Sequence, residues 1–145
     1  MQSEEGALGA RTVAALLADA RSQLRRLTPF EAHCACADGA RLVDIRPDAD
    51  RRLHGTVPGA HVIPRNVLEQ RLDPHCVQCD TEIAEGGARV ILFCEDGFQS
   101  SLAAATVRRF GIDATDIIDG FAAWRAAGLP VAAATIEELG DSVVA

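Results

Sequence analysis

The stretch RVILFCEDGFQSSLAAATVRRFG, residues 89–111, decides the fold of this chain. Its opening run, RVILFC (89–94), reads as apolar on both faces, which is typical of a central strand in a parallel sheet. From residue 100 to residue 111 the apolar side chains recur at helical spacing, and a glycine ends the pattern. The stretch therefore predicts a buried strand, a short loop opened by Cys94, and a helix.

Strands and helices alternate along the rest of the chain. Further strands are predicted at 41–45, 61–64 and 114–118, and further helices at 29–37 and 66–72. A last helix is predicted after Asp119, which would cap it, and before Gly128 and Pro130, which would end it. The alternation predicts an α/β fold with a small, mainly parallel sheet and helices on both faces. Residues 73–87 follow neither pattern and are expected to form a surface excursion, and 135–140 are expected to form a single helical turn.

The N-terminal region has the pattern of an amphipathic helix. Apolar residues at helical spacing run from Val13 to Leu27, and Arg21, Arg25 and Arg26 lie mostly on the opposite side. We expect this helix to cover apolar surface. The chain then divides into a helical extension packing on the domain (1–26), the main domain (27–131) and a C-terminal tail (132–145).

Length and charge exclude several classes of function. The chain has 145 residues, enough for one domain, and a net charge of −7, which disfavours nucleic acid and anionic membranes as partners. No apolar run approaches the ~20 residues of a membrane span. The acidic N-terminus lacks the features of a signal peptide, so a cytoplasmic location is expected. The sequence gives no indication of the oligomeric state.

Cys94 stands where ligands bind in open α/β sheets, at the carboxyl end of a central strand. The residues that follow, EDGFQ, are too few for a wandering loop, and Gly97 can adopt the left-handed conformation that a tight turn needs. Such a turn directs several N–H groups inward, and these groups and the helix dipole stabilise a thiolate. The alternative for Cys94 is a buried, inert core thiol.

Four blocks of the sequence occur together in the single-domain rhodanese family of sulfurtransferases. They are LVDIRP (42–47), GTVPGAHVIP (55–64), VILFCEDGFQSSLAA (90–104) and IIDGFAAWRAAGLPV (117–131). The chain resembles this family from about Leu27 to Val131, over the blocks in their usual order. The resemblance implies a rhodanese-like α/β domain between residues 27 and 131.

The resemblance also implies an activity. Cys94 would accept a sulfane sulfur, become a persulfide, and pass the sulfur to a thiol or another nucleophile. The donor would be a small-molecule or protein persulfide, and neither a metal nor an organic cofactor is implied. The terminal sulfur would be held by N–H groups of the active-site loop, which is made of Glu95, Asp96, Gly97, Phe98, Gln99 and Ser100.

The loop departs from the common family pattern in two ways. Gln99 replaces the arginine that many members carry, and Glu95 and Asp96 follow the cysteine where thiosulfate-using members often carry a basic residue. We expect these acids to repel thiosulfate, so that thiosulfate is a poor donor. One alternative is a non-catalytic binding or regulatory module on the same fold. A second alternative, a phosphatase, is disfavoured because a phosphatase loop is one residue longer and carries an arginine that binds phosphate.

Two arginines and an aspartate outside the loop are candidate supporting residues. Asp44 and Arg46 match the Asp-x-Arg signature of the family, and a structural brace between them is favoured over a direct part in chemistry. Arg65 follows the strand at 61–64 and could reach the mouth of the site to compensate for the missing loop arginine. The simpler interpretation of Arg65 is an ordinary exposed arginine.

The other cysteines form two close pairs. Cys76 and Cys79 make a CxxC motif, which could resolve a persulfide or form a redox disulfide. Cys34 and Cys36 make a CxC motif on a predicted helix, where residues i and i+2 do not face the same way, so one zinc site shared by both pairs is disfavoured. The simplest alternative is that all four are ordinary thiols.

Overall fold

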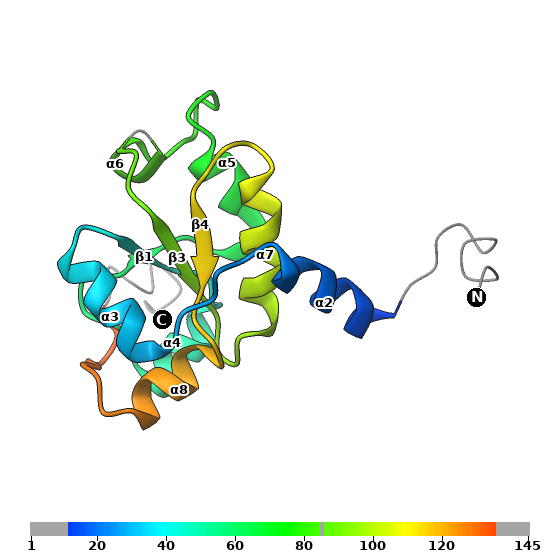
Figure 1. Ribbon diagram of the computed structural model, residues 1–145. Helices are drawn as coiled ribbons and strands as arrows, with labels where there is room; N and C mark the ends of the chain where they lie inside the picture. The colour runs from blue at the N-terminus through cyan, green and yellow to red at the C-terminus, as the bar shows by residue number, and fades with distance from the viewer. Residues whose placement is uncertain (1–11, 85, 136–145) are drawn as a thin grey trace.

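The computed structural model describes residues 12–84 and 86–135 and is built on a four-stranded sheet (Figure 1). The strands are β1 (Arg41–Asp44), β2 (His61–Val62), β3 (Val90–Phe93) and β4 (Ala114–Asp116). They lie in the order β2-β1-β3-β4, and each neighbouring pair is parallel. This confirms the predicted α/β fold and places the carboxyl ends of all four strands at one edge of the sheet.

The central strand β3 is buried because its side chains contribute to both cores. Val90 and Leu92 pack on one side of the sheet with Cys94, which follows the strand, while Ile91 and Phe93 pack on the other. None of these residues is more than 6% exposed. A strand covered on both faces must be apolar throughout, which is the pattern that RVILFC carries.

Helices cover both faces of the sheet, as the alternating pattern predicts. The first face is covered by α3 (Pro29–Ala37) and α8 (Gly120–Ala126), whose Ala32, Phe121 and Trp124 belong to its core. The second face is covered by α5 (Leu68–Leu72), α6 (Thr81–Ala84) and α7 (Phe98–Arg108), with the 3₁₀ helix η1 (Arg65–Val67) leading into α5. The start of α3 is fixed by a capping box between Thr28 and Glu31.

Several details of the secondary structure differ from the sequence-based expectations. Helix α4 (Asp48–His54) was not predicted, because it is short and its N-cap, Pro47, makes no side-chain cap hydrogen bond. The excursion at 73–87 contains α6, and α7 begins two residues earlier than expected. Asp119 stands at the N-cap of α8 but gives no side-chain cap hydrogen bond. The turn expected at 135–140 falls, after its first residue, outside the described residues.

The N-terminal helix differs most from its prediction. Helix α2 (Val13–Ser22) ends five residues before Leu27, which instead forms a parallel bridge with Ile117 beside β4. The helix projects from the body of the domain and packs against α7 (Figure 1). Val13 and Leu16, expected to cover the core, are 58% and 45% exposed.

Part of the polar side of this region also turns inward. Arg21 and Arg26 were expected to lie opposite the core. Their guanidinium groups instead donate hydrogen bonds to the main domain, to a hydroxyl and a carbonyl oxygen from Arg21 and to a carboxylate from Arg26. The apolar stripe is therefore exposed at its start but faces the domain over its later part, where Ala20 and Leu27 are buried and Leu24 packs against the core. In the part of the chain that the structure describes, no helix is long and apolar enough to cross a membrane.

Candidate active site

Cys94 lies directly after β3, at the carboxyl edge of the sheet, and is 6% exposed. Its Sγ accepts hydrogen bonds from the backbone N–H groups of Gly97, at 3.2 Å, and Ser100, at 3.3 Å. Ser100 lies in the first turn of α7, so the sulfur also faces the positive end of that helix dipole. Converging N–H groups of this kind favour a negatively charged sulfur over a neutral thiol.

Gly97 makes this turn possible. It is the N-cap of α7 and has φ 88°, in the left-handed region where residues with a Cβ are strained. A Cβ at this position would lie 2.8 Å from the backbone nitrogen of Asp119, so the loop packs closely on the segment between β4 and α8. Both the backbone conformation and the available space therefore require glycine here.

The start of α8 holds the loop from the other side. The backbone N–H of Phe121 donates to the carbonyl of Cys94, at 2.9 Å, and the N–H of Ala122 donates to the carbonyl of Glu95, at 3.0 Å. The first N–H groups of α8 thus satisfy the hydrogen-bonding capacity of these two loop carbonyls. The N–H groups that bind the sulfur thus belong to a loop that is fixed between the first turns of two helices.

A buried carboxylate lies behind the loop. Asp116, at the end of β4, is fully buried and accepts hydrogen bonds from the hydroxyls of Ser100 and Ser101, each at 2.8 Å. Nε of Arg26 donates to it at 2.8 Å. Sequence reasoning missed this cluster, although a carboxylate inside the strand sequence ATDII already required a buried partner.

A second ion pair network joins β1 to the loop. Arg46 is 1% exposed, and its guanidinium binds both oxygens of Asp44, at 3.0 and 2.8 Å, and Oε1 of Glu95, at 3.0 Å. It also lies over the ring of Phe121, 4.0 Å from the centroid. Burial lowers the pKa of Arg46, but the hydrogen bonds and charges of Asp44 and Glu95 more than offset this, so that its pKa is raised. The structure thus shows Asp44 bracing Arg46, and Arg46 neutralising Glu95.

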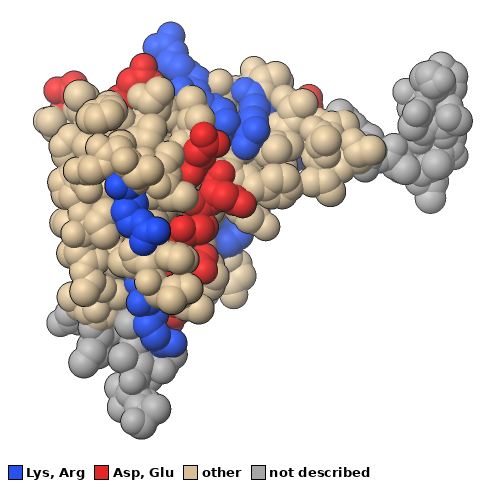
Figure 2. All heavy atoms as spheres, turned by 90° about the horizontal axis from the view of Figure 1, so that it is seen from below, with Lys and Arg blue, Asp and Glu red and all other residues tan. Residues whose placement is uncertain are grey.

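Asp96 is the acid that remains at the mouth of the site. It is exposed, its Oδ1 lies 3.8 Å from Cys94 Sγ, and the same oxygen accepts the N–H of Phe98 at 3.1 Å. Figure 2 looks onto this end of the molecule and shows acidic side chains gathered along its middle, with basic side chains on either side. A negatively charged ligand approaching Cys94 therefore meets a carboxylate next to the sulfur.

The arginine expected to compensate at the mouth does not contact the loop. Arg65 pairs with Glu69 on the following turn, with Nη1 to Oε1 at 2.9 Å. Gln99, which stands in the usual place of the loop arginine, is exposed. Among the described residues, no arginine donates a hydrogen bond to Cys94 Sγ.

The CxxC pair lies away from Cys94. Cys76 shares a surface hollow with Thr106, Arg109 and Phe110, at the C-terminal end of α7, whereas Cys94 lies at the N-terminal end of that helix. The eleven residues of α7 span about 15 Å. Cys76 and Cys79 are both unpaired thiols, and the sulfur of Cys76 lies 3.1 Å from Oε1 of Gln78. The structure does not bring this pair to the sulfur of Cys94.

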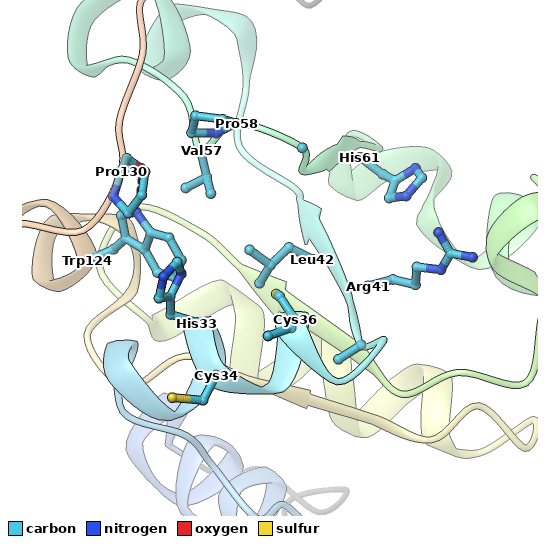
Figure 3. Close-up of a pocket in the computed structure, with 13 residues that line it drawn as sticks. His33, Cys34, Cys36, Arg41, Leu42, Val57, Pro58, His61, Trp124 and Pro130 are labelled. Atoms are coloured by element: carbon cyan, nitrogen blue, oxygen red, sulfur yellow. Dashed lines mark hydrogen bonds between the residues drawn. The ribbon is translucent and has the colours of Figure 1, made fainter.

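The CxC pair borders a hollow in the surface of the protein (Figure 3). This cavity of about 510 Å³ lies on the α3 and α8 face of the sheet, between α3, Leu42 and Trp124. Cys36 points into it and Cys34 points away, as a helix requires of residues i and i+2. Burial raises the pKa of the Cys36 thiol. Within residues 12–84 and 86–135, no three His, Cys, Asp or Glu side chains are grouped to hold a metal ion.

The fold and this loop define a class: a parallel α/β protein with a cysteine held by backbone amides at the carboxyl edge of its sheet. Residues 28–127 match the family model of the rhodanese-like domain, and the chain belongs to that family. The comparison with curated proteins found no match.

Three solved structures illustrate the likeness. A protein of unknown function from Rhodopseudomonas palustris, described as a possible tyrosine phosphatase, is 32% identical, with a TM-score of 0.78, and the match covers 84% of this chain and 95% of that one. A thiosulfate sulfurtransferase from Pseudomonas aeruginosa is 28% identical, with a TM-score of 0.57, over 74% of this chain but 19% of that longer one. A rhodanese-related protein from Thermoplasma volcanium is 18% identical, with a TM-score of 0.62, over 76% and 99%, and shares the fold.

Proposed function

We propose that this protein is a sulfurtransferase that carries a sulfane sulfur on Cys94. The Cys94 thiolate attacks the outer sulfur of a persulfide donor, the sulfur–sulfur bond of the donor breaks, and the donor leaves as a thiolate. The outer sulfur of the Cys94 persulfide is then attacked by an acceptor thiolate, which takes that sulfur and returns Cys94 to its thiolate form. Each step exchanges one sulfur–sulfur bond for another, so no external oxidant or reductant is needed.

The single observation that carries this proposal is the convergence of two backbone N–H groups on Cys94 Sγ. A sulfur anion formed or released in either transfer would be stabilised by donors that are already in place. Membership of the rhodanese-like family and the 28% identity to a thiosulfate sulfurtransferase support the same reaction class.

The charge at the mouth supports a persulfide rather than thiosulfate as the donor. Arg46 neutralises Glu95, but the Asp96 carboxylate remains beside the sulfur, where a dianion such as thiosulfate would be repelled. We therefore expect efficient transfer from a low-molecular-weight or protein persulfide to a thiol acceptor, and a thiosulfate KM above about 1 mM, the upper end of common values.

Replacing Asp96 with asparagine tests this donor preference. Asp96→Asn keeps an oxygen that can accept the Phe98 N–H and removes the charge, so kcat/KM for thiosulfate should rise about threefold to tenfold, and kcat/KM for a neutral persulfide should change by less than twofold. Steady-state kinetics with both donors measure this. Asp113→Asn, an exposed aspartate before β4, is the matched control and should change neither value. A thiosulfate KM well below 1 mM in the unchanged protein would refute the preference.

Two other functions can be distinguished from this one. A binding or regulatory module on the same fold would keep the loop but take up no sulfur from any donor. A phosphatase is suggested by the description of the relative from Rhodopseudomonas palustris. However, phosphate chemistry relies on an arginine that grips the phosphate, and Gln99 and Ser100 occupy the two places in this loop where that arginine would stand.

A further inference from the structure

We propose that Arg21 is a positioning residue for the Cys94 loop and that, with Arg26, it supplies from behind the loop the positive charge that Gln99 no longer supplies within it. This inference rests on the proposed use of Cys94 as a sulfur carrier. It gives the N-terminal segment, which precedes the part of the chain that matches the rhodanese-like family model, a role in the chemistry of the site.

Arg21 reaches the loop from the last turn of α2. Its Nη2 donates to the carbonyl oxygen of Gly97 at 2.9 Å, and its Nε donates to the hydroxyl of Ser101 at 3.0 Å. The side chain is half-buried, and the contact lies where α2 packs against α7 (Figure 1). One guanidinium thus binds both the residue that begins α7 and a residue within its first turn.

Arg26 binds the same carbonyl from a second direction. Its Nη2 lies 3.3 Å from the Gly97 oxygen and 3.2 Å from Oδ2 of Asp116, while its Nε binds Oδ1 of that carboxylate. Asp116 in turn accepts the hydroxyls of Ser100 and Ser101. Ser100, one of the two residues whose N–H groups bind the sulfur, is therefore held in place by Arg26 through Asp116.

The charges behind the loop do not cancel. Asp116 neutralises one of the two guanidinium groups, and among the described residues no carboxylate forms an ion pair with Arg21. On the other side of the loop, Glu95 is paired with Arg46, and the carboxylate of the exposed Asp96 lies 3.8 Å from the sulfur. Arg21 is thus a positive charge, without an ion pair among the described residues, that opposes Asp96 and favours a sulfur anion in the loop.

The binding of the Gly97 carbonyl also has a geometric consequence. Gly97 is held in the left-handed region, where its own N–H is directed at Cys94 Sγ while its carbonyl is directed at the two arginines. Glycine has wide conformational freedom, and the two arginines, together with the Ser101 hydroxyl at 3.2 Å, hold the peptide that follows it against rotation. Anchoring the carbonyl keeps the loop in the conformation that binds sulfur.

The test measures the reactivity of Cys94 itself and needs no sulfur donor. The unchanged protein, Arg21→Ala and Arg21→Lys are alkylated with iodoacetamide at a series of pH values, and modification of Cys94 is followed by peptide mass spectrometry. Arg21→Ala should alkylate about threefold to tenfold more slowly near neutral pH, and the pH of half-maximal rate should move upward, because removing a positive charge disfavours the thiolate. Arg21→Lys should recover most of the rate.

Arg25→Ala is the matched control, because Arg25 is exposed and the Thr115 hydroxyl binds its backbone carbonyl, which the replacement keeps. It should leave the alkylation profile unchanged. A folded Arg21→Ala protein with the original profile would overturn the inference. If Arg21→Ala does not fold, Arg21→Gln removes the charge but keeps a donor for Gly97, and its alkylation profile is compared with that of the unchanged protein.

Alkylation involves no sulfur transfer, so its result is independent of the proposed function. Slowed alkylation of Arg21→Ala, in a protein that never accepts sulfur, would uphold this inference and reject only the proposed function.

Discussion

Arg46→Met is expected to lower the free energy of unfolding by about 3 kcal/mol, the lower end of the usual cost of removing one partner from a buried ion pair. Methionine retains much of the apolar packing against Phe121, so the loss comes from the charges. Asp44 is 1% exposed and would lose both of its bonds to the Arg46 guanidinium, and Glu95 would lose its ion pair. Asp44 would keep the backbone N–H of residue 46, at 2.9 Å, and the more distant buried Arg51, at 3.6 Å. The change therefore affects the end of β1 and the Cys94 loop together.

Urea denaturation of the Arg46→Met protein gives this quantity, and Arg52→Met is the matched control. Arg52 lies in α4 and is exposed, so its replacement should change the stability by less than about 0.5 kcal/mol. A loss smaller than about 1 kcal/mol for Arg46→Met would contradict the network described between β1 and the loop. The loss should also be greater than that of a variant that removes only the half-exposed partner, such as Glu95→Gln.

Gly120→Ala is expected to damage both the fold and the site. A Cβ at this position would lie 2.5 Å from the carbonyl oxygen of Cys94 and 2.8 Å from the nitrogen of Gly97, which is the donor to Cys94 Sγ. These are backbone atoms, so neither can move aside without moving the loop. The residue also has φ 62°, which adds the strain of a left-handed alanine, so we expect a loss of about 3 kcal/mol or more.

Gly128→Ala separates the steric clash of the added Cβ from the strain of the left-handed backbone. Gly128 has φ 78°, but a Cβ there would meet no atom within 4 Å, so its replacement should cost only about 1–2 kcal/mol. Denaturation measures the stabilities, and alkylation of Cys94 reports on the loop, which should be altered in Gly120→Ala alone. Equal costs for the two variants would mean that the close approach of α8 to the loop has no energetic weight.

Local patterns were enough to predict the frame of the molecule. The doubly apolar run before Cys94 gave the central strand, and the Thr28–Glu31 capping box gave the start of α3, because both signals act over a few residues. The position of Cys94 at the end of that strand, followed by Gly97, gave the candidate loop for the same reason. Within this loop only the start of α7 was misplaced, since the left-handed glycine leads directly into the helix.

The parts that sequence could not supply depend on contacts between distant segments. Arg21 and Ser101 are 80 residues apart, and Arg26 and Asp116 are 90 apart, so no local period indicates their pairing. The apolar stripe correctly placed Ala20, Leu24 and Leu27 against the domain, but hydrophobic spacing takes no account of a buried carboxylate that requires a cation. The Arg26–Asp116 ion pair and the Arg21 hydrogen bonds therefore add contacts to this segment that its apolar spacing does not predict.

The most direct test of the central claim is the intact mass of the reduced protein after incubation with a low-molecular-weight persulfide. We predict the added mass of one sulfur atom, its removal by a thiol acceptor, and its absence from Cys94→Ser. Cys36→Ser, which removes the half-buried thiol of the cavity, should still take up the sulfur. No adduct with several donors, or an adduct that persists in Cys94→Ser, would contradict the proposal that Cys94 carries sulfur.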